Sequence, residues 1–253
     1  QLSKVVPSDS ANVWIKLEYV NPTGSYKDRM ALAMIERAEV RGDLRPGMTV
    51  VEYTGGSTGS SLAFICAVKG YEFHVISSDA FSKEKLDTMK AFGAKLEIIN
   101  SSTGKISSSL IQKMIERAQK LALRDDYFFT DQLNNIDIIK GFEMMGNEIQ
   151  KQMDNPIDAF CCSVGTAGAL MGVSNILLQS NSNVKIVVLE PDTAAYYSKG
   201  KKDGEHHVEG VGLGFELPLL NSNNYDEARG INEEESRNMA RLLAQEEGIF
   251  AGT

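Results

Sequence analysis

Short apolar runs alternate along the chain with longer segments in which apolar residues recur at helical spacing. An apolar run of about four to eight residues between turn signals is typical of a buried strand, and spacings of about three and four are typical of an amphipathic helix. This pattern predicts strands over residues 13–17, 48–53, 71–77, 95–99, 127–130, 159–163 and 184–190. It predicts helices over residues 27–40, 58–68, 82–92, 107–123, 136–153, 168–179 and 233–245.

The alternation of strands and helices with short connections is typical of an α/β fold, in which a mostly parallel sheet is flanked by helices. The length of 253 residues fits one large domain or two smaller lobes of this kind. In such folds, ligands bind beyond the carboxyl ends of the strands. We therefore expect the functional residues in the loops that lead from a strand into the next helix.

Two further segments do not follow this alternation. Residues 198–209 are polar and charged, which predicts a surface loop. The last residues, Gly248 to Thr253, form an apolar run that predicts a strand leading into a turn. Because a strand is an unusual place for a domain to stop, we expect the fold to continue beyond Thr253.

The composition excludes several classes of protein. The net charge of −8 and the lack of a basic run argue against a nucleic-acid partner. No apolar stretch approaches the roughly 18 residues of a membrane span, and the first residues lack the apolar centre of a signal peptide. Three histidines make a histidine-rich metal site improbable, so no metal is expected.

The cysteines indicate a reducing compartment. Cys66, Cys161 and Cys162 lie in apolar runs without metal-binding spacing, and an odd number cannot all pair within one chain. They are predicted to be buried, reduced thiols, which is typical of a cytoplasmic protein.

A lysine stands at the start of the first predicted helix. Pro22 and Gly24 predict a turn and Ser25 is a suitable N-cap residue, so that Lys27 falls in the first helical turn. The helix dipole disfavours a cation there. An amine that does chemistry must lose its proton, which burial or nearby positive potential favours. Lys27 is therefore either a solvated residue or a reactive amine.

Two glycine-rich loops follow predicted strands. Thr54–Ser61, TGGSTGSS, and Ser163–Ala169, SVGTAGA, each open a predicted helix. Exposed backbone N–H groups and small hydroxyls at a helix N-terminus form a cradle for a carboxylate or a phosphate. Each loop alone could equally be a simple small-residue turn. Together with Lys27, they describe a site for an anionic cofactor and an anionic substrate that an amine links.

These motifs resemble those of the fold-type II pyridoxal 5'-phosphate enzymes, most closely the cysteine synthase and cystathionine β-synthase branch. The run from Asn21 to Arg29, NPTGSYKDR, resembles the cofactor-lysine motif of that branch, and the match covers nearly the whole chain. The resemblance implies a tryptophan synthase beta-like fold with two lobes, each a mostly parallel twisted sheet flanked by helices. Residues 32–134 would form the smaller lobe, and residues 1–31 and 135–253 the larger lobe. Pyridoxal 5'-phosphate would lie in the cleft between them.

The resemblance also implies a role for each site residue. Lys27 would form the Schiff base with the cofactor aldehyde and later remove the α-proton of the substrate, while the pyridine ring is the electron sink. The cofactor would further be bound by Ser57, Gly165, Thr166, Ala167, Gly168 and Ala169. The substrate would be bound by Thr54, Gly55, Gly56, Ser57, Thr58, Gln132 and Gly210, the last within the glycine-rich stretch Val208–Phe215.

Three positions depart from the family pattern. The carboxylate loop commonly reads Thr-Ser-Gly-Asn-Thr-Gly, whereas here Gly55 replaces the serine and Ser57 replaces the asparagine that bonds the ring hydroxyl. In the phosphate loop, Ala169 stands where a threonine is usual. The loss of one hydrogen bond to a charged group is worth roughly 1.5–3 kcal/mol, which weakens a site without abolishing it.

The implied reaction is β-replacement on an activated serine, such as the synthesis of L-cysteine from O-acetylserine and sulfide. The partners would be a small amino acid and a small nucleophile, and family members are usually homodimers. Asp28 and Arg29 after the lysine favour this branch over the dehydratases. A β-eliminating, dehydratase or threonine-synthase-like lyase remains an alternative, as does a catalytically silent relative that acts as a binding protein.

Overall fold

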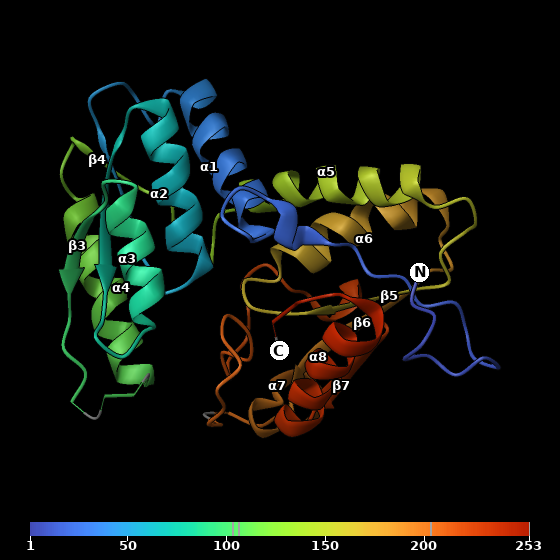
Figure 1. The fold of residues 1–253 in the computed structure, drawn as a ribbon. Helices are drawn as coiled ribbons and strands as arrows, with labels where there is room; N and C mark the ends of the chain where they lie inside the picture. The colour runs from blue at the N-terminus through green and yellow to red at the C-terminus, as the bar shows by residue number, and fades with distance from the viewer. Residues whose placement is uncertain (103, 106, 203, 253) are drawn as a thin grey trace.

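The computed structural model describes residues 1–102, 104–105, 107–202 and 204–252. Its α-helices are α1 (Lys27–Arg41), α2 (Ser57–Lys69), α3 (Lys83–Ala91), α4 (Ser108–Ala122), α5 (Asp137–Gln152), α6 (Gly168–Ser180), α7 (Tyr196–Lys199) and α8 (Glu233–Glu247). Its strands are β1 (Thr49–Tyr53), β2 (Glu72–Ser77), β3 (Lys95–Ile98), β4 (Tyr127–Phe129), β5 (Ala159–Ser163), β6 (Lys185–Pro191) and β7 (Glu227–Ile231). Short 3-10 helices are η1 (Glu18–Val20), η2 (Asp192–Ala194) and η3 (Ser222–Asn224). Figure 1 shows two separate sheets that helices join.

The first sheet is parallel, in the order β3-β2-β1-β4. Successive side chains of a strand point to opposite faces, so Val50 packs in the core with α1 and α2, while Val51 packs against α4. Helix α4 buries the predicted stripe that contains Leu110 and Met114. The apolar residues of α4 therefore recur at helical spacing because they cover one face of this sheet.

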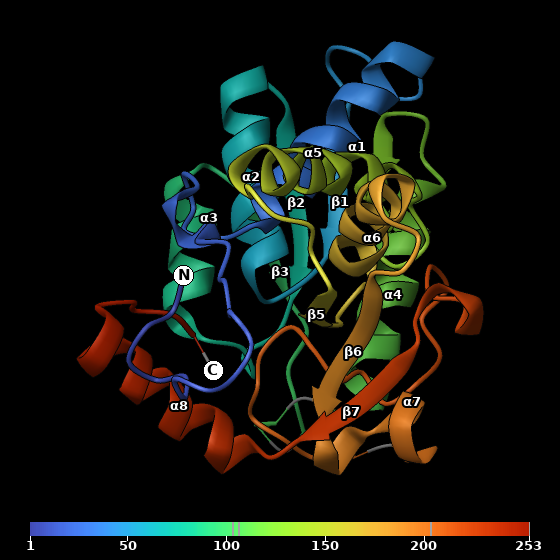
Figure 2. The ribbon, with the colours of Figure 1, turned by 90° about the vertical axis from the view of Figure 1, so that its right-hand side faces the viewer.

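The second sheet is also parallel, in the order β5-β6-β7. Figure 2 shows α5 and α6 side by side above β5 and β6. The two helices approach closely because glycines face their contact: a Cβ atom on Gly172 would lie 2.5 Å from the carbonyl oxygen of Ile139. Likewise, a Cβ atom on Gly146 would lie 2.9 Å from Cβ of Ile176.

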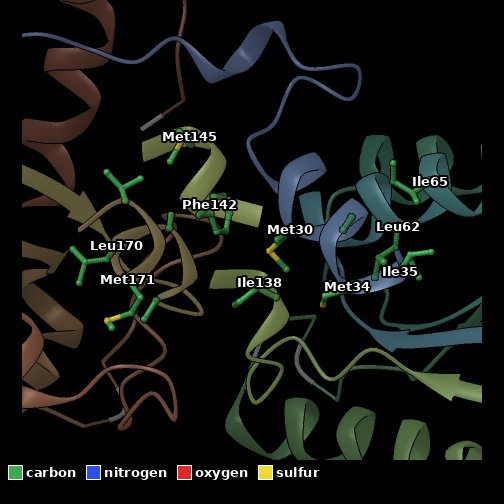
Figure 3. Packing of buried hydrophobic residues seen from close by; sticks show 14 of the residues in the cluster. Met30, Met34, Ile35, Leu62, Ile65, Ile138, Phe142, Met145, Leu170 and Met171 are labelled. Atoms are coloured by element: carbon green, nitrogen blue, oxygen red, sulfur yellow. The ribbon is translucent and has the colours of Figure 1, made fainter. Parts of the chain in front are cut away.

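A continuous apolar core links the two sheets. Met30 and Met34 of α1 lie between Leu62 of α2 and the α5 residues Ile138 and Phe142 (Figure 3). All five side chains are fully buried. Helix α1 runs through the predicted boundary between residues 31 and 32, so any division into lobes crosses a continuous helix. The lobe assignment itself stays a prediction.

Several sequence predictions were wrong. Residues 13–17 do not form a strand, because their backbone has no strand partner; Leu2 donates one hydrogen bond to the carbonyl of Val13 at 2.8 Å. The described part of the predicted C-terminal strand, residues 248–252, is also not a strand, and Phe250 is 85% exposed. Thr253 lies outside the described residues. The predicted loop over 198–209 begins inside α7, and its residue Asp203 is likewise outside the described residues.

The sequence missed β7 and α7 and overestimated the burial of the cysteines. Strand β7 reads EARGI, and its polar residues suit the edge of a sheet, where Glu227 pairs with Lys185 of β6 at 2.5 Å. The three cysteines are free, but only Cys66 is fully buried, while Cys162 is half-buried and Cys161 is exposed. Among the described residues, no helix has the length and apolarity needed to cross a bilayer.

Candidate active site

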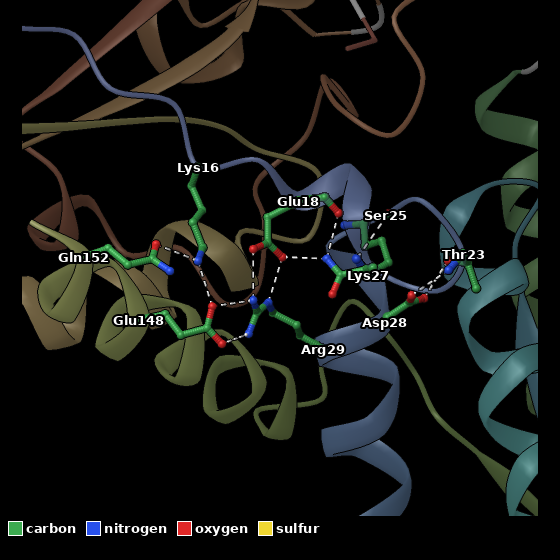
Figure 4. Close-up of polar contacts among 10 residues, drawn as sticks. Lys16, Glu18, Thr23, Ser25, Lys27, Asp28, Arg29, Glu148 and Gln152 are labelled. Carbon is green, nitrogen blue, oxygen red and sulfur yellow. Dashed lines mark hydrogen bonds and ion pairs between the residues drawn. The ribbon is translucent and has the colours of Figure 1, made fainter. Parts of the chain in front are cut away.

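A buried carboxylate holds the turn before α1. Asp28, which is 6% exposed, accepts hydrogen bonds from the backbone N–H of Thr23 at 2.9 Å and from its hydroxyl at 2.6 Å (Figure 4). Gly24 has a φ of 73°, in the left-handed region that glycine adopts without steric cost. The helix dipole also favours an acid in the first turn. The backbone ahead of Lys27 is therefore fixed.

A network of charges fixes the start of α1 from the other side. Arg29 donates to Glu18 of η1 at 2.7 Å and to Glu148 of α5 at 2.7 Å, and Lys16 pairs with Glu148 at 2.7 Å (Figure 4). The hydrogen bonds from Arg29, followed by those from Lys16, lower the pKa of Glu148 to about 2. The network thus ties the N-terminal segment to α1 and α5.

Lys27 is the first residue of α1, and its side chain is almost fully buried. Tyr26 is the N-cap residue in place of the predicted Ser25, whose hydroxyl accepts from the backbone N–H of Lys27 at 3.2 Å (Figure 4). The amine lies 4.8 Å from the centroid of the Tyr26 ring and has no hydrogen bond or ion pair with any described residue. Lys27 is therefore a mostly buried residue whose amine is available to a ligand.

The amine lies near the loop that precedes α6. Burial raises the pKa of the Cys162 thiol in β5 to about 12, and the positive charge of Lys27 acts on this thiol in the opposite direction. The ring of Tyr26 packs on Phe142 with 5.3 Å between centroids, and Phe142 lies 3.4 Å from the position that a Cβ atom on Gly168 would take. The structure thus brings the lysine and the predicted phosphate loop to one region.

The predicted phosphate loop has an unusual backbone. Ala167 caps α6 with a φ of 65°, a left-handed conformation that costs a residue with a side chain about 1–2 kcal/mol. A Cβ atom on Gly165 would overlap the carbonyl oxygen of Gly210, so the loop is in contact with the glycine-rich stretch Val208–Phe215. Thr166 is buried, and its hydroxyl accepts from the N–H of Gly168 at 3.4 Å.

The donors of this loop fit a phosphorylated cofactor. The first N–H groups of α6 lack acceptors within the helix, and a left-handed residue followed by helical ones turns successive N–H groups into one concavity. Gly165 and Gly168 have no room for a side chain, which keeps the backbone bare. Ala169 is buried and contributes no hydroxyl. A phosphate held here and an aldehyde held by Lys27 match pyridoxal 5'-phosphate.

The predicted carboxylate loop connects β1 to α2. Thr54 is buried, and its hydroxyl accepts from the N–H of Gly56, the N-cap residue of α2, at 3.3 Å. Ser57 begins the helix and has no side-chain hydrogen bond with the residues that the structure describes. A Cβ atom on Gly55 would overlap the ring of Phe81. The glycine that departs from the family pattern thus makes room for an aromatic ring.

Gln132 joins this loop from the end of β4. The hydroxyl of Thr58 donates to Oε1 of Gln132 at 2.8 Å, and Nε2 of Gln132 donates to the carbonyl of Tyr53 at 3.1 Å. The lysine turn also reaches α2, since the hydroxyls of Thr23 and Ser61 lie 3.3 Å apart. The three predicted loops therefore surround one region, although no hydrogen bond between described residues connects Lys27 directly to Gln132.

Sequence reasoning missed three residues of the site. Glu52 and Thr130 are fully buried beneath the carboxylate loop, and Phe81 packs on Gly55. An acid inside the apolar run before the loop was a signal for Glu52. No local pattern could reveal Phe81, because its contact with Gly55 depends on the turn after β2.

This fold and these loops fit one class of protein: an α/β enzyme that binds a phosphorylated cofactor. The whole chain, residues 1–253, matches the family described as pyridoxal-phosphate dependent enzyme, and the chain belongs to that family. It is 39% identical to a cysteine synthase of Staphylococcus aureus over the whole chain and 80% of that protein.

Solved structures agree with this family. A cysteine synthase from Entamoeba histolytica matches with a TM-score of 0.86 and 33% identity, over 94% of this chain and 69% of that one. An O-acetyl serine sulfhydrylase isoform from the same organism matches with a TM-score of 0.85 and 34% identity, over 94% and 69% of the two chains. The fold is that of the fold-type II enzymes, and the protein is an enzyme that depends on pyridoxal phosphate.

Proposed function

We propose that this enzyme makes L-cysteine by β-replacement, with O-acetylserine as the activated serine and sulfide as the nucleophile. The relatives named above support this reaction. The observation that carries the proposal is the buried, unpaired amine of Lys27 beside the loop before α6. A protein that does not bind an aldehyde would have no use for such an amine.

Lys27 and two loops would hold the cofactor. Lys27 would anchor it covalently, the N–H groups of the loop from Gly165 to Ala169 and the hydroxyl of Thr166 would bind its phosphate, and Ser57 would serve its ring hydroxyl. When bound, pyridoxal phosphate supplies an electron sink for the electrons of the substrate's Cα–H bond.

A second set of residues would hold the substrate. The N–H groups of Gly55, Ser57 and Thr58 would face its carboxylate at the start of α2, where the helix dipole favours an anion. The N–H groups of Thr54 and Gly56 already donate to the carbonyl of Ile76 and the hydroxyl of Thr54. Gln132 stands beside Thr58 and completes this cradle, and Gly210 borders the site from the larger lobe. Once released by the substrate's amino group, the amine of Lys27 takes the proton from Cα. The hydroxyl of Ser57 is shorter than an asparagine amide and offers fewer hydrogen-bonding groups.

We further propose the assembly and location of the enzyme. Residues 32–134 form a smaller lobe that closes on the substrate, and two copies of the chain form a homodimer in the cytoplasm, as the family resemblance implies. Three free cysteines are compatible with a reducing compartment. Sedimentation equilibrium of the purified enzyme tests the dimer, and a mass of one chain would reject it.

The reaction is tested by replacing Lys27. The wild type is expected to absorb in the near-visible region, and borohydride should attach the cofactor permanently to the peptide that contains Lys27. Lys27→Ala should lose this attachment and at least about 100-fold in turnover, the usual minimum for a proton-transfer group. Lys83→Ala, at a lysine of α3 that is 87% exposed, is the matched control and should retain both.

The substrate is tested in the same preparation. O-acetylserine, O-phosphoserine, serine and threonine are offered with and without sulfide, and cysteine and 2-oxo acids are measured. Sulfide-dependent cysteine from O-acetylserine is the expected result. Formation of 2-oxo acid alone would show a lyase, and a colourless protein without turnover would show a silent relative.

A further inference from the structure

Glu52 is a buried acid without a basic partner. It lies in β1, two residues before Thr54, and is fully buried. Among the described residues, no lysine, arginine or histidine forms an ion pair with it. Burying a carboxylate is costly unless hydrogen bonds compensate it. Burial raises the pKa of Glu52 to about 8, although hydrogen bonds from Thr130, Gln132 and Tyr53 act in the opposite direction.

The carboxylate fills a gap in the sheet. Strand β4 pairs with β1 only as far as Phe129, which lies beside Val51. Beyond this point Oε1 of Glu52 accepts from the N–H of Tyr53 at 2.9 Å, and Oε2 accepts from the N–H of Gln132 at 3.0 Å. Glu52 therefore takes the place of the missing ladder bonds where the chain leaves β4.

Thr130 completes this arrangement. Its hydroxyl donates to Oε2 of Glu52 at 2.7 Å, so the same oxygen receives two donors. The next residue, Asp131, has a φ of 47°, a left-handed conformation that is uncommon outside glycine. In the turn that presents Gln132, the backbone is thus strained at Asp131, and the carboxyl group of Glu52 accepts hydrogen bonds from both of its neighbours, Thr130 and Gln132.

Gln132 connects the carboxyl group of Glu52 to the loop Thr54–Ser61, which is predicted to bind the substrate carboxylate. The side chain of Gln132 bridges the Thr58 hydroxyl at the start of α2 and the carbonyl of Tyr53. We propose that Glu52 is a positioning residue for the amino-acid substrate: it fixes the backbone of Gln132, and Gln132 in turn fixes Thr58. This inference rests on the proposed function, in which Thr58 and Gln132 face the substrate carboxylate.

Glu52→Gln tests this role with little change of shape. Both oxygens of Glu52 face backbone N–H donors, but an amide has only one acceptor oxygen, so its NH2 group must face the N–H of Tyr53 or of Gln132. We expect this variant to raise the KM for O-acetylserine about tenfold, while the KM for sulfide and the near-visible absorbance stay within about twofold of wild type. Hydrogen exchange at the Gln132 amide of the cofactor-free protein should be at least about tenfold faster.

A double-variant cycle separates positioning from general stability. In the Gln132→Ala background, Glu52→Gln should raise the KM for O-acetylserine less than about twofold further. The Gln132 side chain that connects Glu52 to Thr58 is already absent in that background. Tyr127→Phe is the matched control: it removes the 3.2 Å contact between Tyr127 and His74 in the same sheet, and should leave both KM values unchanged. A full tenfold effect of Glu52→Gln in both backgrounds would reject the inference.

The remaining outcomes are also decisive. An unchanged KM in Glu52→Gln with an active wild type would reject the role of Glu52 alone, whereas a wild type that makes no cysteine would reject the proposed function. If Glu52→Gln does not fold, Thr130→Val removes one donor to the carboxylate and should accelerate exchange at the Gln132 amide about threefold or more. Unaltered exchange in Thr130→Val would then overturn the inference.

Discussion

Gly55 and Phe81 show how a missing side chain shapes the site. The family pattern places a serine at position 55, and here the ring of Phe81 occupies the space that its Cβ atom would need. The ring atom concerned is Cγ, close to the backbone, so the ring cannot yield by a small movement. Gly55 and Phe81 are therefore a coupled pair.

Replacing Gly55 with serine should destabilise the protein. Overpacking of a filled site costs about 1–3 kcal/mol, so we expect Gly55→Ser to lower the free energy of unfolding in urea by this amount. In the Phe81→Ala background the same substitution should cost less than about 0.5 kcal/mol, because the ring is gone.

Gly56→Ser is the control for this pair. A Cβ atom on Gly56 would meet nothing within 4 Å, and serine is a favourable N-cap residue for α2. Its unfolding free energy should therefore equal or exceed that of the wild type. An equal loss of unfolding free energy in Gly55→Ser and Gly56→Ser would contradict the coupling between Gly55 and Phe81.

At this scale the sequence offered polar site candidates but not the residues that support them. Lys27 and Thr58 could be selected as candidates from short motifs, because a lysine at a helix start or a glycine-rich turn is visible locally, whereas Gln132 was selected from the family resemblance alone. Phe81 could not be selected, because its partner, Gly55, lies 26 positions earlier in the chain, as the two residue numbers show. Contacts between loops of different strands are set by the packing of the sheet.

Among the elements, the N-terminal segment shows the limit of apolar patterning. Residues 13–17 read as a strand, yet Trp14 is 51% exposed, and the segment is held by the ion pair of Lys16 with Glu148. The pairing joins residues that are 132 positions apart. Strand β7 was missed for the opposite reason, because an edge strand can be polar and still complete a sheet.

The ion pairs of Glu148 predict how stability depends on pH. The pKa of Glu148 in the folded protein is about 2, below its ordinary value of 4.5, so its contribution is complete above pH 4.5 and is lost as the pH falls towards 2. The difference in unfolding free energy between wild type and Glu148→Gln should shrink over this range. Because Glu148 is 40% exposed, the difference should also shrink with added salt.

The measurement is urea unfolding at a series of pH values from 6 down to about 2. Glu116→Gln is the control, since Glu116 is exposed on α4 and accepts a hydrogen bond from Gln112 alone among the described residues. Because Glu116→Gln removes no ion pair between described residues, its unfolding free energy should stay close to that of the wild type at pH 6. If the difference in unfolding free energy between wild type and Glu148→Gln stays constant from pH 6 to about 2, the charges of this network do not stabilise the fold.

For the whole molecule, alternation of strands and helices predicted a mostly parallel α/β fold but left open whether it forms one domain or two lobes, and only the family resemblance implied two units. The pattern could not show how they join, because α1 belongs to the core of both: Met30 and Met34 contact α2 on one side and α5 on the other (Figure 3). Because the two units share α1, the two predicted anion-binding loops, which follow the carboxyl ends of β1 and β5, lie near the lysine turn.

This shared core predicts which part of the proposed smaller lobe would move if it closes on the substrate. The buried contacts of Met30 and Met34 with Ile138 and Phe142 would be costly to separate, so the movement should be carried by the loops around the first sheet. When O-acetylserine is added without sulfide, amide exchange should slow in residues 54–58 and 78–82 and stay unchanged in residues 30–35.

The radius of gyration from solution X-ray scattering should fall in the same sample. Wild-type enzyme to which sulfide is added without O-acetylserine serves as the control, and neither exchange nor scattering should change in it, because sulfide alone places no amino acid in the site. Slower exchange across residues 30–35 would place the moving part in α1. Unchanged exchange in residues 54–58, with a shifted absorbance that shows bound substrate, would mean that the cradle is already closed before the substrate arrives.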